Sequence, residues 1–432
     1  MRNKSPFFTV IIPCKNRANY LKHTLRTCMI QDYDSLEILV SDDGSKDNTQ
    51  EVVAEATQRD PRIKYIKPTT GKGMLNNFEF ALQQAKPGFV MALGGDDGLM
   101  PNGIQGMCET LYETSMELLS WSAPTYYYPN VIGERGQLTI YRDKELKIIK
   151  SNDFLNRQAK SLTYSSDRES PMFYVKGVVS TELVERVRKR SSNGRFYSCS
   201  TPDGYSGIVL AGEVDSFAHS GKPFSLYGAS PSSHGLTYVS NDENAKKISK
   251  EFFENASLVP MHRELAYQPY SPMISLMTID FLLTAKDLPG WNGSFPAINF
   301  KDVITKSLIE LSSGMYGDQR IGRELAILSK IADLHGLSDF FQKKVKKTKC
   351  YAKRDPFTGH GISTDKIYLD GDDYHIKNIF DASYAFQNIY QVYSDLTFKS
   401  VMNTISRSFN HRIRAMRGES SSFPPESEWN KF

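Results

Sequence analysis

Two adjacent aspartates near the end of the first hundred residues are the clearest candidates for chemistry. Asp96 and Asp97 follow a short apolar run and two glycines, Gly94 and Gly95. Paired carboxylates at the end of a strand can offer hard oxygen ligands to a divalent cation that also carries substrate phosphates. Glycine has no Cβ atom, so backbone and ligand can approach closely there. Such tripeptides also form ordinary turns, and the position in the chain has to decide between the two interpretations.

The elements that would position these aspartates alternate regularly. Apolar runs and helical spacing predict strands over 7–13, 36–41, 63–67 and 88–93, with helices over 17–31, 48–59 and 72–85 between them. Asp47 with Gln50 resembles a capping box at the start of the second helix. Strict alternation predicts parallel βαβ units with right-handed crossovers. Ligands of such sheets bind outside the carboxyl ends of the strands.

Polar residues and glycines follow each of the four predicted strands, at 13–17, 42–45, 69–73 and 94–97. No Gly-x-Gly-x-x-Gly follows the first strand, which disfavours a dinucleotide cofactor, and the full spacing of a phosphate-binding P-loop is also missing. The pattern that remains is a nucleotide site. Acidic groups would serve the base and ribose, and a carboxylate would hold a metal ion on the diphosphate.

Composition limits the class of protein. The chain has 432 residues, 24% charged and 40% apolar, which is typical of a soluble globular protein of two or three domains. A net charge of +4 does not indicate a nucleic-acid partner, although it suits an anionic substrate. We expect no leader peptide and no apolar run of the roughly 18 residues that span a bilayer. Five scattered cysteines favour reduced thiols and a cytoplasmic location.

Four segments in order carry a resemblance to a known family: 9–17, 37–47, Asn76 with Asn77, and 93–101. Together they resemble the family 2 glycosyltransferases, which have the GT-A fold, over roughly the first 105 residues. The resemblance implies an α/β nucleotide-sugar-binding domain whose reaction inverts the anomeric carbon. It also implies a divalent cofactor, Mn²⁺ or Mg²⁺.

The resemblance implies roles for particular residues. Asp42 would accept a hydrogen bond from the nucleobase with Asp43 beside it, and the segment 71–77 would pass near the ribose and diphosphate. Asp96 would be the metal-binding carboxylate of the Asp-x-Asp motif, with Asp97 second. Family members usually have an acid at the position of Gly94, which leaves open the number of protein ligands to the metal. The implied donor-binding residues are Pro13, Asn16, Arg17, Asp42, Asp43, Gly71, Asn76, Asn77, Gly95, Asp96 and Asp97.

An inverting transfer also needs a base for the acceptor hydroxyl. Asp203 lies about a hundred residues beyond the aspartate pair, where family members place this base, although it could instead cap the helix predicted at 205–211. Glu213 and Asp215 are the fallback candidates. His234, in a loop of glycine and serine, would join the metal or be an exposed loop residue.

The remaining chain would supply the acceptor half and a helical C-terminal domain. Strands are predicted at 118–128, 172–176 and 223–226. The aromatic side chains of Trp121 and 126–128 could stack on sugars or pack within a sheet. Helical spacing beyond about residue 240 predicts helices over 245–258, 273–286, 300–312, 322–335 and 338–346. The predicted domains are therefore 1–239, divided at 105, and 240–432.

Two basic clusters, at 343–349 and 407–417, are either solvated faces or a contact with anionic lipid headgroups at the inner face of a membrane. The acidic run 370–373 lacks the spacing of a calcium loop and is predicted to be a turn before a helix from about residue 375.

Three functions remain. The first is an inverting, metal-dependent glycosyltransferase that acts on a glycan or lipid-linked acceptor in surface polysaccharide synthesis. The second is a catalytically silent relative that binds a nucleotide sugar or glycan. The third is a nucleotidyltransferase, disfavoured because the loop after the first strand, 13–17, has no glycine. The sequence determines neither the sugar nor the oligomeric state.

Overall fold

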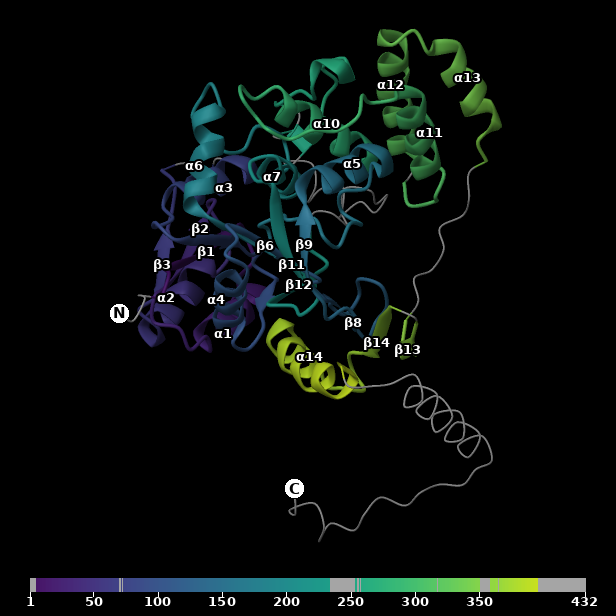
Figure 1. Ribbon diagram of the computed structural model, residues 1–432. Coiled ribbons are helices and arrows are strands. Elements are labelled where there is room, and N and C mark those ends of the chain that lie inside the picture. Colours follow the sequence, from purple (N-terminus) through teal and green to yellow (C-terminus); the bar gives the residue numbers. More distant parts are fainter. Residues whose placement is uncertain are drawn as a thin grey trace, which may run out of the picture. The chain divides into compact units, whose positions relative to one another are not determined.

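The computed structural model (Figure 1) describes residues 5–69, 71, 73–233, 253, 254, 256, 258–316, 318–349, 358–363 and 365–394. By its internal contacts the chain divides into two units, Met1–Phe386 and Gln387–Phe432. The elements below belong to the first unit, except for the end of the last helix.

An eight-stranded sheet lies at the centre of this unit, in the order β3, β2, β1, β4, β10, β6, β11, β9. Its strands are β1 (Phe8–Cys14), β2 (Leu36–Asp42), β3 (Ile63–Ile66), β4 (Phe89–Ala92), β6 (Leu118–Trp121), β9 (Leu146–Lys150), β10 (Gly177–Ser180) and β11 (Ser216–Ser220). The first four are mutually parallel, which confirms the predicted βαβ units, whereas β10 is antiparallel to both of its neighbours.

Helices cover both faces of this sheet (Figure 1). One face carries α1 (Ala18–Met29), α2 (Thr49–Arg59) and α4 (Gly103–Thr114), and the other carries α3 (Met74–Gln83), α5 (Ser151–Ser161), α6 (Thr181–Arg190) and α7 (Pro202–Ala211). Side chains alternate between the faces along a strand. Val10 and Ile12 of β1 accordingly pack in one apolar core, whereas Ile11 packs in the other. Both faces are buried, so β1 reads as a continuous apolar run.

A second sheet, in the order β13, β14, β8, β7, β12, β5, begins directly after the aspartate pair. Its strands are β5 (Gly98–Leu99), β7 (Thr125–Tyr127), β8 (Gln137–Tyr141), β12 (Ser225–Ala229), β13 (Gly361–Ile362) and β14 (Lys366–Asp370). Strand β5 pairs with β12, and a Cβ atom on Gly228 of β12 would lie 1.7 Å from the carbonyl oxygen of Asp96. Only glycine permits this approach, which brings β12 against the aspartates.

Beyond these strands lie α10 (Ile274–Lys286), α11 (Phe300–Leu311), α12 (Asp318–Leu334), α13 (Ser338–Lys347) and α14 (Ile379–Ser394). The first four confirm the helices predicted from residue 273 onward. Nearly every side chain of α10 is buried, because α10 packs on α7 and α11. A Cβ on Gly204 of α7 would lie 2.4 Å from the ring of Phe281 on α10.

Parts of the C-terminal prediction are not addressed by the described residues. Most of the helix predicted at 245–258 lies outside them, as does the boundary at 240, so the two-domain division stays a prediction. The basic cluster 407–417 and Cys350 also lie outside. The sequence did not predict β13 and β14, and β14 extends the second sheet by pairing with β8.

Several local predictions were wrong. The run 118–128 is not one strand, because it breaks before β7 at Pro124, which has no backbone N–H to donate. The run 172–176 forms only an isolated bridge to Ala92, since Val175 has a left-handed φ of 58°. The strand predicted at 223–226 is β12, which begins at Ser225 and continues to Ala229.

The capping box predicted at the start of α2 is also absent. The carboxylate of Asp47 instead accepts from the backbone N–H groups of Thr49 and Ala18.

Two findings on the described residues concern the cysteines and the helices. The four described cysteines, Cys14, Cys28, Cys108 and Cys199, are free and buried. Within the described residues, no helix combines the length and the apolar character needed to cross a bilayer.

The acidic run 370–373 forms a turn. Asp370 accepts from two backbone N–H groups of this turn, and Arg135 pairs with all three of its aspartates. The helix that follows begins at Ile379, later than predicted.

Asp280 of α10 makes the stability of this fold depend on pH. Burial raises the pKa of its carboxyl to about 7, although the backbone N–H of His262 donates to it at 2.7 Å. A carboxyl whose pKa is higher in the folded state than in the unfolded state loses stability as pH rises between the two values, by about 1.4 kcal/mol per pH unit. We therefore expect Asp280→Asn to match the wild type in melting temperature near pH 4 and to exceed it at pH 8. If the melting temperatures of the two proteins changed with pH in the same way across this range, the raised pKa assigned to Asp280 would be contradicted.

Candidate active site

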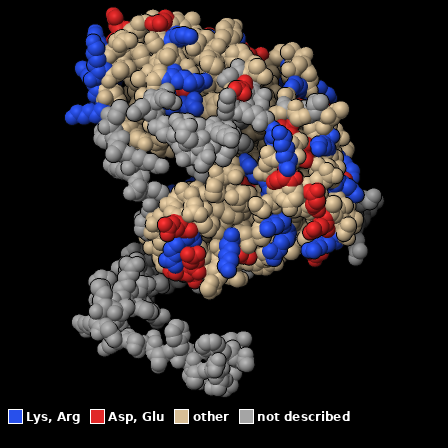
Figure 2. Space-filling model, turned by 180° about the vertical axis from the view of Figure 1, so that it is seen from behind, with Lys and Arg blue, Asp and Glu red and all other residues tan. Residues whose placement is uncertain are grey.

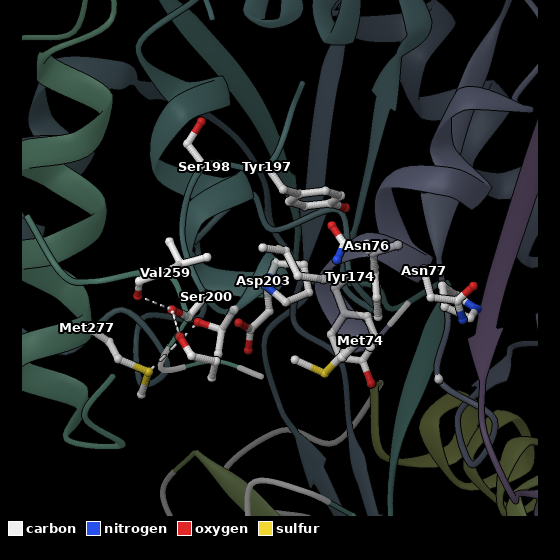
Figure 3. A pocket seen from close by; sticks show the side chains of 18 of the residues that line it. Met74, Asn76, Asn77, Tyr174, Tyr197, Ser198, Ser200, Asp203, Val259 and Met277 are labelled. Atoms are coloured by element: carbon white, nitrogen blue, oxygen red, sulfur yellow. Dashed lines mark hydrogen bonds between the residues drawn. The ribbon is translucent and has the colours of Figure 1, made fainter. Parts of the chain in front are cut away.

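A cavity of about 1160 Å³ lies at the carboxyl ends of the parallel strands, between α3, α7 and α10 (Figure 3). It brings together most of the residues expected at a donor site, which are Pro13, Arg17, Asp43, Asn76, Asn77, Gly95, Asp96 and Asp97, together with the expected base, Asp203. Asn16, Asp42 and Gly71 are not among its lining residues. His234 lies outside the described residues. Four separate loops thus converge on one space, as the alternation of strands and helices predicts.

Of the first aspartate pair, Asp43 and not Asp42 faces the cavity. Asp42 is buried, and its carboxylate accepts from the backbone N–H and hydroxyl of Ser45, at 2.9 and 2.5 Å, and from the hydroxyl of Tyr65 at 2.6 Å. Asp43 accepts from the N–H of Gly73 at 3.1 Å. Asp42 therefore fixes its own loop, whereas Asp43 lies at the wall of the cavity.

Asn16 and Arg17 join the loop after β1 to its surroundings. Asn16 has a left-handed φ of 53°, donates its N–H to Ser45 Oγ at 2.8 Å and accepts from the N–H of Lys46 at 2.7 Å. Asparagine tolerates this backbone conformation better than most residues. Arg17 lines the cavity, and its guanidinium donates to the carbonyl of Ser232. The loop thereby holds a positive charge at the cavity wall.

The third loop leads into α3. Asn77 exchanges hydrogen bonds with Ser41 at the end of β2, accepting from the hydroxyl at 2.6 Å and donating to the carbonyl at 2.9 Å. Its neighbour Asn76 accepts from Arg195 at 2.7 Å. A Cβ atom on Gly71 would lie 3.4 Å from the carbonyl oxygen of Asp43, so the third loop runs close to the second.

The two aspartates after β4 have different surroundings. Asp96 accepts from the hydroxyls of Ser230 and Ser233 through one oxygen, at 2.6 and 2.8 Å. Asp97 accepts from the backbone N–H groups of Gly94 and Gly228, at 2.6 and 2.8 Å. Burial, and then the negative charge of Asp96, raises the pKa of Asp97 to about 8, while these N–H groups oppose the rise. The raised pKa of Asp97 thus reflects the cost of placing two carboxylates side by side in a buried cavity wall.

The structure also explains the glycine at position 94. A Cβ atom there would lie 2.7 Å from Asp97 Oδ2 and 2.7 Å from the hydroxyl of Tyr174. Real Cβ atoms essentially never lie so close to another atom, so the carboxylate of Asp97 or the hydroxyl of Tyr174 would have to shift. Glycine at position 94 leaves both groups in place.

The carboxylates of Asp96 and Asp97 fit a divalent cation that takes few ligands from the protein. No group of three His, Cys, Asp or Glu residues that could hold a metal occurs in the described part of the chain. Asp97 directs both oxygens to backbone N–H groups, so Asp96 is the carboxylate left for an ion. Mg²⁺ is commonly bound by one or two carboxylates together with substrate phosphates and water.

Asp203 lies in the first turn of α7, after Pro202, and Thr201 occupies the N-cap position instead. The Oδ1 atom of Asp203 is buried and has no hydrogen-bond partner. Burial raises the pKa of Asp203, against the effect of a hydrogen bond from the backbone of Gly204. The fallback candidates do not line the cavity, and Glu213 is paired with Arg190 at 2.7 Å.

Sequence reasoning missed several lining residues. Tyr164, Tyr174, Arg195, Tyr227 and Met277 reach the cavity from loops, from β12 and from α10, and no motif marks them. Sheet packing accounts for Trp121, which donates to Ser225 Oγ at 2.8 Å, and for Tyr126, which donates to the carbonyl of Ile376. Tyr127, the residue after Tyr126, lines the cavity.

Comparison with known proteins identifies the domain that carries this site. Residues 9–166 match the family described as Glycosyl transferase family 2. The chain contains a family 2 glycosyltransferase domain with the GT-A fold. The family 2 domain includes all four loops that follow β1 to β4, whereas Asp203 and α10 lie beyond the matched residues.

Curated relatives share this part of the chain. The GalNAc(5)-diNAcBac-PP-undecaprenol beta-1,3-glucosyltransferase of Campylobacter jejuni is 35% identical over 109 residues, which are 25% of this chain and 35% of that protein. The hyaluronan synthase of Pasteurella multocida is 30% identical over 103 residues, 24% of this chain and 10% of its own. Glycosyltransferase GlyG of Streptococcus pneumoniae is 26% identical over 197 residues, 45% of this chain and 62% of its own. The match thus spans about a third of the Campylobacter protein.

Solved structures are similar at low sequence identity. TarS of S. aureus, crystallised with UDP-GlcNAc, has 14% identity and a TM-score of 0.43, over 79% of this chain and 91% of that one. A mannosyltransferase from Pyrobaculum calidifontis, solved with GDP-Man and Mn²⁺, has 15% identity and a TM-score of 0.36, over 80% and 86%.

Gly94→Asp, which restores the acid usual in the family, is expected to damage this site. The new side chain would overlap the carboxylate of Asp97, and we expect a loss of about 1–3 kcal/mol in the free energy of unfolding, as for other overpacked cores. Gly94→Ala should show the same effect more weakly. Gly322→Ala is the matched control, because that glycine has nothing within 4 Å of a built Cβ. Denaturant titration measures the free energy of unfolding of the three variants. A Gly94→Asp variant as stable as the wild type would contradict the packing explanation.

Proposed function

We propose that the chain is an inverting, metal-assisted glycosyltransferase, which moves a sugar from a nucleoside diphosphate to a hydroxyl of a glycan or lipid-linked acceptor. One observation carries the proposal. A single cavity holds a carboxylate pair suited to a cation, a cationic side chain and a buried carboxylate, Asp203, whose Oδ1 atom has no hydrogen-bond partner. These are the groups that transfer from a diphosphate requires.

The donor would occupy the part of the cavity next to the parallel strands. Asp43, rather than Asp42, is the carboxylate that can accept from a nucleobase, because Asp43 lines the cavity and Asp42 does not. Arg17 would lie near the diphosphate, where its charge favours the anionic leaving group. Asn77 holds α3 against β2 and so sets the width of this part.

Asp96 would hold the cation, and Ser230 and Ser233 orient its carboxylate. A bound Mn²⁺ or Mg²⁺ ion supplies Lewis acidity to the departing diphosphate. Asp97 acts through position, since it ties the Asp96 loop to β12.

Asp203 would accept the proton of the attacking hydroxyl. Asp203 lines the cavity, its Oδ1 atom has no hydrogen-bond partner, and its raised pKa makes it a stronger base than an exposed aspartate. Attack from this side, opposite the diphosphate, inverts the anomeric carbon.

The location of the acceptor belongs to the same proposal. Lys343, Lys346 and Lys347 of α13 are exposed, and Figure 2 shows basic side chains gathered along the edge that α13 forms, at the upper left of the view. These charges support a peripheral contact with anionic lipid headgroups on the cytoplasmic side of a membrane. A lipid-linked acceptor in surface polysaccharide synthesis would be reached there.

Asp96→Asn tests the metal-binding role. We expect turnover of a panel of nucleotide sugars to fall at least tenfold, and half-maximal activity to need more Mn²⁺, because an amide is a poorer ligand than a carboxylate. Asp32→Asn, at an exposed position, is the control. A donor that the wild type consumes equally well with and without chelator would exclude metal assistance.

Asp203→Asn tests the base. We expect transfer to an acceptor to fall by about 10²–10⁴-fold, the usual contribution of a general base. In the wild type, kcat/KM should fall as pH drops through the raised pKa of Asp203, since only the carboxylate accepts a proton, and the variant should lack this limb. Pre-steady-state and pH-rate measurements give both results. Full transfer by the variant would exclude Asp203, and a wild type that binds but consumes no donor would favour a catalytically silent relative.

A further inference from the structure

The cavity continues past Asp203, away from the aspartate pair. In Figure 3, Asp203 lies between Asn76, Met74 and Tyr174 on one side and Ser200, Val259 and Met277 on the other. The second group belongs to the start of α7, to the segment before α10 and to α10 itself. We call this part, lined by Tyr164, Thr201, Val259, Tyr270, Ile274 and Met277, the α10 compartment.

Hydroxyl groups surround a thioether in the α10 compartment. The sulfur of Met277 lies 3.6 Å from the hydroxyl of Tyr270, 3.9 Å from that of Thr201 and 4.0 Å from that of Tyr164. Thioether sulfur is a weak hydrogen-bond acceptor. Buried hydroxyls normally find a stronger one. Tyr164 and Thr201 therefore keep most of their hydrogen-bonding capacity for a ligand.

Thr201, at the N-cap position of α7, also directs its hydroxyl into the α10 compartment. It is the N-cap residue, and a threonine there usually accepts from the N–H of the second or third helical residue through its hydroxyl oxygen. Its hydroxyl makes no cap hydrogen bond and is directed to Met277 in the cavity wall. The position that would stabilise the helix serves the cavity instead.

The charges of the compartment indicate a neutral ligand. The described lining residues from 258 to 289 include no lysine or arginine, and the one acid among them, Asp287, is paired with Arg263 and His262. The nearest basic lining residues are committed elsewhere, Arg190 to Glu213 at 2.7 Å and Arg195 to Asn76 at 2.7 Å. Met277, Val259 and Ile274 offer apolar surface next to the hydroxyls. A sugar ring has an apolar face and a hydroxyl edge, and so matches both.

We propose that the α10 compartment binds the neutral sugar ring that carries the attacking hydroxyl, and that Tyr164 and Thr201 hydrogen-bond to hydroxyls of that ring. The direction of transfer rests on the proposed function, whereas the binding of a sugar does not. The acceptor class is thus a glycan with an uncharged terminal sugar. Tyr164 and Thr201 are specificity-determining residues, and Asp203 lies where the bound ring meets the donor.

The experiment measures binding to the full chain with Mg²⁺ by saturation-transfer NMR. The probes are the methyl glycosides of glucose, galactose, mannose and N-acetylglucosamine, with glucose 1-phosphate as the anionic probe. We expect at least one methyl glycoside to bind. Tyr164→Phe and Thr201→Val should each raise its Kd about three- to tenfold, the usual effect of one lost hydrogen bond. Tyr112→Phe, at a tyrosine that is 52% exposed on α4, is the matched control.

The proposal is overturned if no methyl glycoside binds the wild type, if glucose 1-phosphate alone binds, or if both variants bind as the wild type does. Thr201→Val keeps the shape of the side chain, so a poorly folded Tyr164→Phe does not remove the test. Donor turnover measured on the same samples separates the two proposals. Turnover without glycoside binding contradicts only the sugar subsite, whereas binding without turnover contradicts only the transferase.

Discussion

The site depends on the way in which the carboxylate of Asp97 is held. It accepts from the N–H of Gly94 in its own loop and from the N–H of Gly228 on β12, so one side chain joins the end of β4 to the second sheet. The close approach of Gly228 to the carbonyl of Asp96 makes the same connection through the backbone. With this junction in place, Asp96 is left facing the cavity with Ser230 and Ser233 beside it. The absence of a first acid in the motif is a consequence of this packing.

The cavity has two chemically different ends. Near the parallel strands it is lined by charged groups and amides, which suit a nucleoside diphosphate. Around Met277 it is lined by hydroxyls and apolar side chains, which suit an uncharged ring. Asp203 lies between these ends on the first turn of α7, where Gly204 allows Phe281 and Tyr164 to pack closely. The proposed order of donor, base and acceptor therefore follows from how α10 packs on α7.

Much of the donor half could be predicted because its signals are local. The alternation of apolar strands and amphipathic helices implies parallel pairing, and parallel pairing brings the loops after β1, β2 and β4 to one edge. Asp43 and Asp96 were placed at this edge by that reasoning, whereas Asn77 was assigned through the family resemblance. The division of roles between Asp42 and Asp43 was not predictable, because it depends on the hydroxyl of Tyr65 from the neighbouring strand. The role of Asp47 was not predictable for a similar reason. Its carboxylate accepts from the N–H of Ala18, which lies 29 residues away in another loop.

The sequence by itself determined the fold class, the family resemblance and the line of acidic residues along one sheet edge. Each of these rests on short-range periodicity or on motifs a few residues long. Only the tertiary structure decided why position 94 is glycine, which aspartate of each pair faces the cavity, and what lies beyond Asp203. Those features depend on contacts between separate segments of the chain, such as Tyr65 with Asp42, Gly228 with Asp97 and α10 with α7. Contacts of that kind leave no periodic trace in a single sequence, because each partner needs only to fit the space that the others leave.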